Sequence, residues 1–132
     1  MKHFIYLILI LILILIFKIR KKTYYGIDRK IGRGVFCHNF ILPREIIEIS
    51  PILHIEKTSD IELNNYLFNY KNNSVIGFGI ASMFNHSDNP NIKWDYNKLG
   101  DIVFISKKLI LPGQQLFIDY GKKYWENRKD KF

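Results

Sequence analysis

The sequence predicts a small, mostly β domain with one or two short helices, preceded by an apolar N-terminal helix. Three observations support this prediction. Short runs of β-branched and aromatic residues recur between turn residues, helical spacing is clear only once within the domain, and the segment 4–17 is an unbroken apolar run. A chain of 132 residues has room for one hydrophobic core and a short appendage. We assign residues 1–22 to the appendage and residues 23–132 to the domain.

The apolar run 4–17 is expected to form a membrane anchor. As a helix it would cover roughly 21 Å, against a hydrocarbon core of roughly 30 Å, so spanning would need Ile19 and snorkelling of Lys18 and Arg20. No Ala-x-Ala-like cleavage site follows the run. A secretory signal peptide and a buried strand or core helix are the alternatives. The more basic flank, residues 18–22, predicts that the domain faces the cytoplasm.

The net charge of +8 is concentrated in the appendage. Residues 1–22 hold five basic residues and no acidic residue, which leaves 15 basic and 12 acidic residues, or +3, for the domain. Bulk charge therefore does not support nucleic-acid binding. Cys37 is the only cysteine, which excludes an internal disulfide and a Cys-based zinc cluster and favours a reducing compartment. We expect Cys37 to pack as a small hydrophobic residue.

The first half of the domain predicts short strands and one helix. Residues 32–36, Gly-Arg-Gly-Val-Phe, place a glycine pair before an apolar β-like run, where an ordinary turn is the alternative to close approach of a ligand. Residues 40–42, 46–49 and 52–55 are typical of strands interrupted by prolines. Ser59 and Glu62 match a capping box, which predicts a helix from about Asp60 to Tyr70.

The second half predicts further strands. Residues 75–84 are apolar and include two glycines, which suggests a close neighbouring backbone. Residues 92–96 and 102–105 are predicted to form a hairpin around the loop 97–100, and residues 116–120 follow a Pro-Gly turn. Between these strands, residues 84–91 (Phe-Asn-His-Ser-Asp-Asn-Pro-Asn) form a polar segment. A solvated loop is one interpretation of it, and a set of polar groups that orients a ligand beside an apolar pocket is the other.

Three segments in this order, residues 32–36, 84–91 and 113–121, resemble the SET-domain protein lysine methyltransferases. The likeness is greatest to the compact chlorella-virus SET proteins, and it covers residues 25–128. The resemblance implies a β-clip of small sheets in which the Asn-His-Ser segment and the strand before Asp119-Tyr120 thread together as a pseudoknot. It implies methyl transfer from S-adenosylmethionine to a lysine of a protein, with a histone tail as one candidate substrate, and a homodimer as in the viral group. It requires no metal.

The resemblance also implies roles for individual residues. The backbone around Arg33 and Gly34 would face the methionine part of the cofactor. Asn85 and His86 would hold its amino group and adenine, the histidine largely through its main chain. The other positions carried over are the catalytic Tyr120, which also contacts the cofactor, the walls of the lysine channel at Tyr66, Tyr120 and Tyr124, and Trp125, which would stack on adenine.

The sequence departs from the family pattern at several positions. Gln114-Gln115 replaces a usual Glu-Glu pair, Pro43-Arg44-Glu45 replaces Lys-Gly-Glu, and Arg33 replaces an aromatic residue of the viral group. The apolar appendage is the larger departure. A membrane-tethered, non-catalytic binding module with the same fold is the alternative to an active enzyme.

Overall fold

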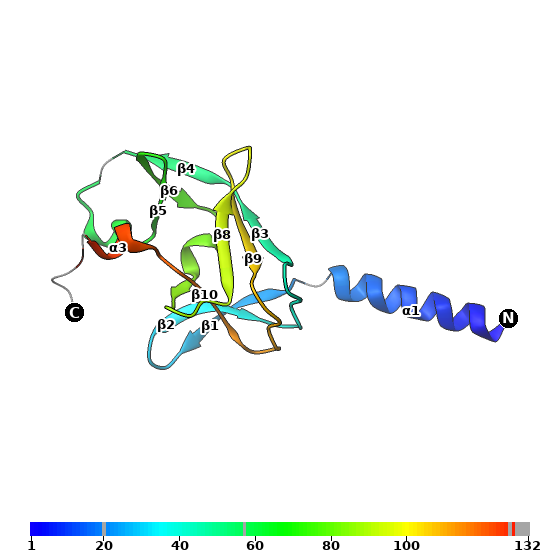
Figure 1. Cartoon of the computed structure of the whole chain (residues 1–132). Coiled ribbons are helices and arrows are strands. Elements are labelled where there is room, and N and C mark those ends of the chain that lie inside the picture. Colours follow the sequence, from blue (N-terminus) through cyan, green and yellow to red (C-terminus); the bar gives the residue numbers. More distant parts are fainter. Residues whose placement is uncertain (20, 57, 127, 129–132) are drawn as a thin grey trace.

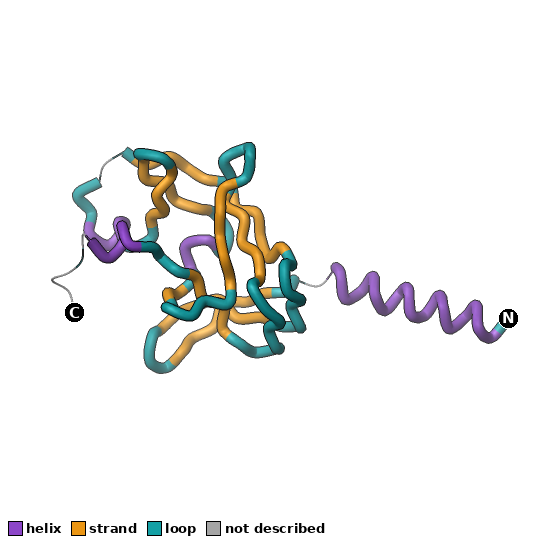
Figure 2. The backbone as a smooth tube through the Cα atoms, viewed as in Figure 1, coloured by secondary structure: helices purple, strands orange, loops and turns teal. Residues whose placement is uncertain are grey.

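The computed structural model describes residues 1–19, 21–56, 58–126 and 128. Strands make up most of the body, and the long helix α1 extends away from it (Figures 1 and 2). The elements in chain order are α1 (Lys2–Ile19), β1 (Thr23–Asp28), β2 (Gly32–Cys37), β3 (Ile46–Ser50), β4 (Ile52–Ile55), α2 (Ile61–Asn64), β5 (Leu67–Tyr70), β6 (Asn73–Gly77), the 3₁₀ helix η1 (Ala81–Met83), β7 (Asn85–His86), β8 (Ile92–Tyr96), β9 (Ile102–Ser106), β10 (Gln115–Ile118) and α3 (Lys122–Glu126).

The strands form three small sheets. One has the order β1-β2-β10-β7, the second β3-β9-β8 and the third β4-β6-β5. All pairs within the sheets are antiparallel except β10 with β7, which run parallel. The short parallel pair joins two segments that are far apart in the sequence, and it defines where the candidate site lies.

The core lies between the sheets and is built from alternating strand residues. In β9, residues 102, 104 and 106 are buried and the residues between them are partly exposed, as the two-residue period of a strand requires. Phe104 stacks on Phe84 with ring centroids 4.6 Å apart and meets the edge of Phe68. Cys37 is fully buried, as expected, and its Sγ donates a hydrogen bond to the Leu111 carbonyl oxygen at 2.8 Å.

The apolar run forms a helix, as predicted, but the membrane anchor is wrong. Within the described residues, no helix has both the length and the apolar character needed to cross a bilayer. The 18 residues of α1 cover roughly 27 Å, and lysines near both ends leave an apolar run of only roughly 21 Å against a core of roughly 30 Å. The predicted location, anchored with the domain on the cytoplasmic side of a membrane, is therefore also wrong.

The predicted helix from Asp60 to Tyr70 is correct only in its first turn. The Asp60 carboxylate, rather than the Ser59 hydroxyl, accepts the hydrogen bond from the Leu63 N–H at 2.9 Å, and the helix ends at Asn64. Beyond it, Leu67–Tyr70 pairs antiparallel with β6 instead of continuing the helix. Aromatic and apolar residues suit a half-buried strand, so tertiary pairing outweighs the local helical spacing.

Most other strand predictions are confirmed, with small differences. The hairpin of β8 and β9 forms around the loop 97–100. The strand predicted at residues 40–42 is reduced to an isolated bridge between Ile41 and Ile110. The strand β1, for which the sequence analysis predicts no element, pairs with β2 along its whole length.

Candidate active site

Parallel pairing of β7 with β10 brings together two of the three segments that carry the resemblance. Asn85 pairs with Phe117 and His86 with Ile118, and the Ser87 N–H donates to the Ile118 carbonyl oxygen at 3.0 Å. The chain leaves β10 directly into Asp119 and Tyr120. Two segments that are distant in the sequence, 85–87 and 119–120, therefore lie close together, the first in the edge strand β7 and just after it, the second directly after β10.

The glycine pair of β2 lies beside this edge. Asn85 Nδ2 donates to the Arg33 carbonyl oxygen at 3.0 Å. A Cβ atom at Gly34 would lie 2.8 Å from Asn85 Nδ2 and 2.3 Å from Gln115 Nε2, both too close for real contacts. Because Gly34 has no side chain, the Asn85 amide can lie close to its Cα and reach the Arg33 carbonyl group of β2. Arg33, Gly34 and Asn85 were all predicted to contact the cofactor, and the structure brings the three residues together.

Tyr120 is held by two hydrogen bonds of different kinds. Its hydroxyl donates to the Phe84 carbonyl oxygen at 2.6 Å, and its N–H donates to His86 Nδ1 at 3.2 Å. Burial raises the pKa of Tyr120 to about 12, with smaller contributions from the neighbouring phenols of Tyr124 and Tyr66. The hydroxyl is therefore neutral near pH 7, and its hydrogen points at a main-chain acceptor.

The His86 side chain contacts both the main chain and the ring of Tyr120. Because Nδ1 accepts from the Tyr120 N–H, we assign the ring hydrogen of the neutral form to Nε2, which lies 3.1 Å from Asp88 Oδ1. The ring also packs against Tyr120 and Trp125, at centroid distances of 5.3 and 4.9 Å. The resemblance predicts that this histidine acts largely through its main chain, but the structure also gives its side chain a positioning role.

The helix α3 adds aromatic side chains to the same place. The Tyr124 ring lies 4.6 Å from the Tyr120 ring, and the Trp125 ring stacks on Tyr120 at 6.2 Å with an angle of 18° between the ring planes. The predicted site residues at positions 86, 120, 124 and 125 therefore form one aromatic cluster.

An open cleft of about 670 Å³ lies in front of the cluster, next to a small cavity of about 30 Å³. Tyr66, Tyr120 and Tyr124 line both spaces, whereas the predicted cofactor residues Arg33 and Asn85 line only the cleft. Gly34, His86 and Trp125 line neither the cleft nor the cavity. Gly34 lies against Asn85, and His86 and Trp125 pack on Tyr120. The cleft is lined by Ile31, Arg33, Asn65, Tyr66, Ser82, Met83, Phe84, Asn85, Tyr120, Tyr124 and Arg128.

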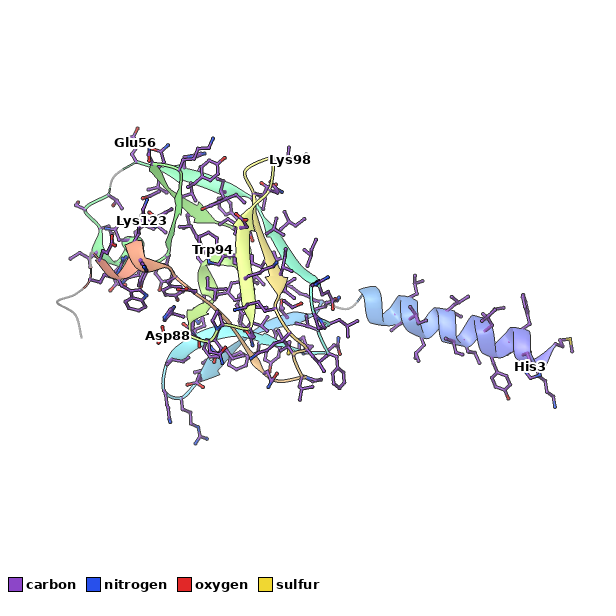
Figure 3. The ribbon with its side chains drawn as sticks, in the orientation of Figure 1. His3, Glu56, Asp88, Trp94, Lys98 and Lys123 are labelled. Carbon is purple, nitrogen blue, oxygen red and sulfur yellow. The ribbon has the colours of Figure 1, made fainter. Side chains whose placement is uncertain are left out.

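Several residues that line the site were not predicted from the sequence, and three of them make contacts that matter for its geometry. Asn65 and Arg128 line the cleft, and Trp94 lines the small cavity. Trp94 extends from β8 into the middle of the body (Figure 3), and its Nε1 donates to the Asp119 carbonyl oxygen at 2.9 Å. The alternation of residues 92–96 gives the orientation of Trp94 relative to its neighbours, but nothing in that pattern links it to Asp119.

Comparison with known proteins relates this geometry to a family. Residues 32–121 match the model of the SET domain. A histone-lysine N-methyltransferase specific for H3 lysine 37, from Schizosaccharomyces pombe (strain 972), is 33% identical over 106 residues, which cover 74% of this chain and 71% of the relative. The crystal structure of a candidate histone methyltransferase from Plasmodium falciparum has a TM-score of 0.70 and 31% identity, and the match covers 81% of this chain and 99% of that one.

Proposed function

The chain belongs to the SET-domain family, and from this premise we propose that the cleft beside Tyr120 is the site of its protein-lysine methylation. As a member related to histone-lysine methyltransferases, the chain is a protein-lysine N-methyltransferase that uses S-adenosylmethionine. The residue roles are our proposal. The observation that carries it is the hydrogen bond from the Tyr120 hydroxyl to the Phe84 carbonyl oxygen, inside an aromatic cluster that lines the cleft.

The described residues fit S-adenosylmethionine. A cleft of about 670 Å³ lies within the roughly 300–1,000 Å³ typical of cofactor sites. Its wall offers the Asn85 amide and the Arg33 guanidinium, which suit the amino acid end of the cofactor. When bound, S-adenosylmethionine supplies an electrophilic methyl group on a sulfonium centre. We propose that Arg33, Gly34, Asn85, His86 and Trp125 hold it, with Gly34, His86 and Trp125 acting through the residues they support.

The three tyrosines that line both the cleft and the small cavity would receive the target lysine. Their ring faces attract the ammonium group, roughly 0.5–2 kcal/mol per contact, and the loss of water lowers its pKa. We propose Tyr66 and Tyr124 as channel walls and Tyr120 as the residue that orients the amine. Because the Tyr120 hydrogen points at the Phe84 carbonyl, the phenol oxygen presents lone pairs that can accept a hydrogen bond from the amine.

Tyr120 orients rather than removes a proton. With its pKa raised to about 12, tyrosinate is rare near pH 7, so a role as general base would need a scarce species. Holding the amine in an attacking geometry instead accelerates the reaction without any change of charge on the enzyme.

The test is transfer of a labelled methyl group from S-adenosylmethionine to histone H3, chosen because the Schizosaccharomyces pombe relative is named for a lysine of that protein. We expect Tyr120→Phe to lower kcat by roughly 100-fold or more. Tyr96→Phe is the matched control. Tyr96 also has a pKa raised to about 12 by burial and also donates to a main-chain oxygen, of Asn69 at 3.0 Å, but it lines neither space.

Equal losses in the two variants would mean that a buried hydroxyl matters only for stability. Cofactor binding without transfer to any protein would instead support the non-catalytic binding module.

Three finer statements stay part of the proposal. The special likeness to the compact chlorella-virus SET proteins is supported by α3, whose Tyr124 and Trp125 complete the aromatic cluster. The parallel pairing of β7 and β10 supports the pseudoknot of the β-clip. The homodimer remains a prediction, which light scattering tests.

A further inference from the structure

Arg128 joins the tail of the chain to the α2–β5 corner through three hydrogen bonds. Its Nη2 donates to the Asn64 carbonyl oxygen at 2.6 Å, its Nε to Asn65 Oδ1 at 3.2 Å, and its Nη1 to the Tyr124 carbonyl oxygen at 2.7 Å. The guanidinium carbon also lies 3.8 Å from the centre of the Tyr124 ring. One side chain thus contacts two segments that are distant from each other in the sequence.

Tyr124 contacts both Arg128 and Tyr120. The Tyr124 ring packs on Tyr120 at 4.6 Å and on the Arg128 guanidinium at 3.8 Å. The helix α3 has only five residues and no fully buried residue, so it depends on side-chain contacts with the domain to keep its position. Besides the aromatic contacts of Tyr124 and Trp125, Arg128 connects this helix to Asn64 and Asn65.

We propose that Arg128 is a positioning residue for methyl transfer, which holds Tyr124 in the wall of the lysine channel. The inference rests on the function proposed above. Arg128 would affect the part of the cleft that receives the lysine. The part that holds the cofactor depends on Arg33 and Asn85, and none of the three Arg128 hydrogen bonds described above involves either residue. Arginine suits this task because its planar fork can make several hydrogen bonds while it stacks on an aromatic ring.

The alternative is that Arg128 acts only as a positive charge near the cleft. A lysine at position 128 separates the two ideas, because it keeps the charge but cannot reproduce the three hydrogen bonds. Lys122 provides the matched control. It is an exposed cation of α3, the helix that holds Tyr124, and it lines neither the cleft nor the small cavity.

The experiment compares the full chain with its Arg128→Ala, Arg128→Lys and Lys122→Ala variants. For an H3 peptide we expect kcat/KM to fall roughly 10- to 100-fold in both Arg128 variants, mainly through KM, because the channel wall moves. The Kd for S-adenosylmethionine, measured by calorimetry, should change less than about threefold. Lys122→Ala should match the wild type in both measurements.

Hydrogen exchange provides a readout that does not depend on activity. The Tyr124 N–H donates to the Gly121 carbonyl oxygen and the Arg128 N–H to that of Trp125, so these amides should exchange faster in both Arg128 variants. Unchanged exchange, full activity of Arg128→Lys, or an equal loss of peptide and cofactor binding would each overturn the proposal. Absence of transfer by the wild type would refute the proposed function, while the exchange data would still test whether Arg128 holds Tyr124 in position.

Discussion

Replacement of Gly34 by alanine tests whether the β2 backbone supports the cofactor side of the cleft. A Cβ atom there would lie 2.3 Å from Gln115 Nε2 and 2.8 Å from Asn85 Nδ2, whereas ordinary contacts begin at 3.4 Å. The two amide groups must therefore retreat by about 1.1 and 0.6 Å. Asn85 would retreat from the Arg33 carbonyl group to which it donates at 3.0 Å.

The magnitude follows from two terms. Overpacking costs about 1–3 kcal/mol, and loss of the Asn85 hydrogen bond costs about 0.5–1.5 kcal/mol, so we expect the free energy of unfolding to fall by about 1.5–4.5 kcal/mol. If Asn85 also binds the cofactor, the Kd for S-adenosylmethionine should rise at least about tenfold. Urea denaturation and calorimetry measure the two quantities.

Two further variants separate the causes. Gly113 has a positive φ of 82°, and no atom lies within 4 Å of the position that a Cβ would take there. Gly113→Ala should therefore cost about 1–2 kcal/mol of backbone strain and leave cofactor binding unchanged. Adding Gln115→Ala to Gly34→Ala removes the nearer obstacle and should restore part of the stability, while Asn85 stays displaced. Wild-type stability and wild-type affinity in Gly34→Ala would refute this reasoning.

Two predictions concern Tyr120 and its support. Because burial raises the pKa of Tyr120 to about 12, from about 10 in the unfolded chain, its contribution to stability is complete below about pH 10 and is lost as the pH rises towards about 12. Tyr120→Phe should therefore lose less stability than the wild type across this interval, and denaturation curves at several pH values would show whether it does. Trp94→Phe removes the hydrogen bond to the Asp119 carbonyl oxygen and should lower kcat several-fold, with a stability cost of about 1 kcal/mol. Unchanged kcat would show that Asp119 needs no such support to place Tyr120.

Local sequence patterns correctly predicted the elements whose strand pairing in the structure matches the preference of their own residues. The hairpin of β8 and β9 follows from alternation and a turn between neighbouring strands, and it forms as predicted. Helical spacing after Asp60 predicted the wrong structure for residues 67–70, because β6 offers these residues a strand partner that a local pattern cannot show. The strand β1 was missed for the same reason.

The candidate site was predictable where it is formed by short motifs and was missed where single residues complete it. Arg33, Asn85 and Tyr120 belong to three segments whose order carries the family resemblance, and the structure places them around one cleft. Asn65 follows the capped turn of α2, and Arg128 lies among several basic residues of the tail. Their contacts depend on tertiary packing, which neither local composition nor spacing encodes.

The parallel pair of β7 and β10 also has a consequence for folding kinetics. Neighbouring strands such as β8 and β9 can pair early, but β10 must reach Asn85 and Val35, which lie much earlier in the chain. Closing such long loops costs chain entropy before the contacts form, so these pairings are expected late. During refolding from urea, the β signal in circular dichroism should therefore recover before methyl transfer does. The time at which activity returns would then measure when β10 pairs with β7 and β2.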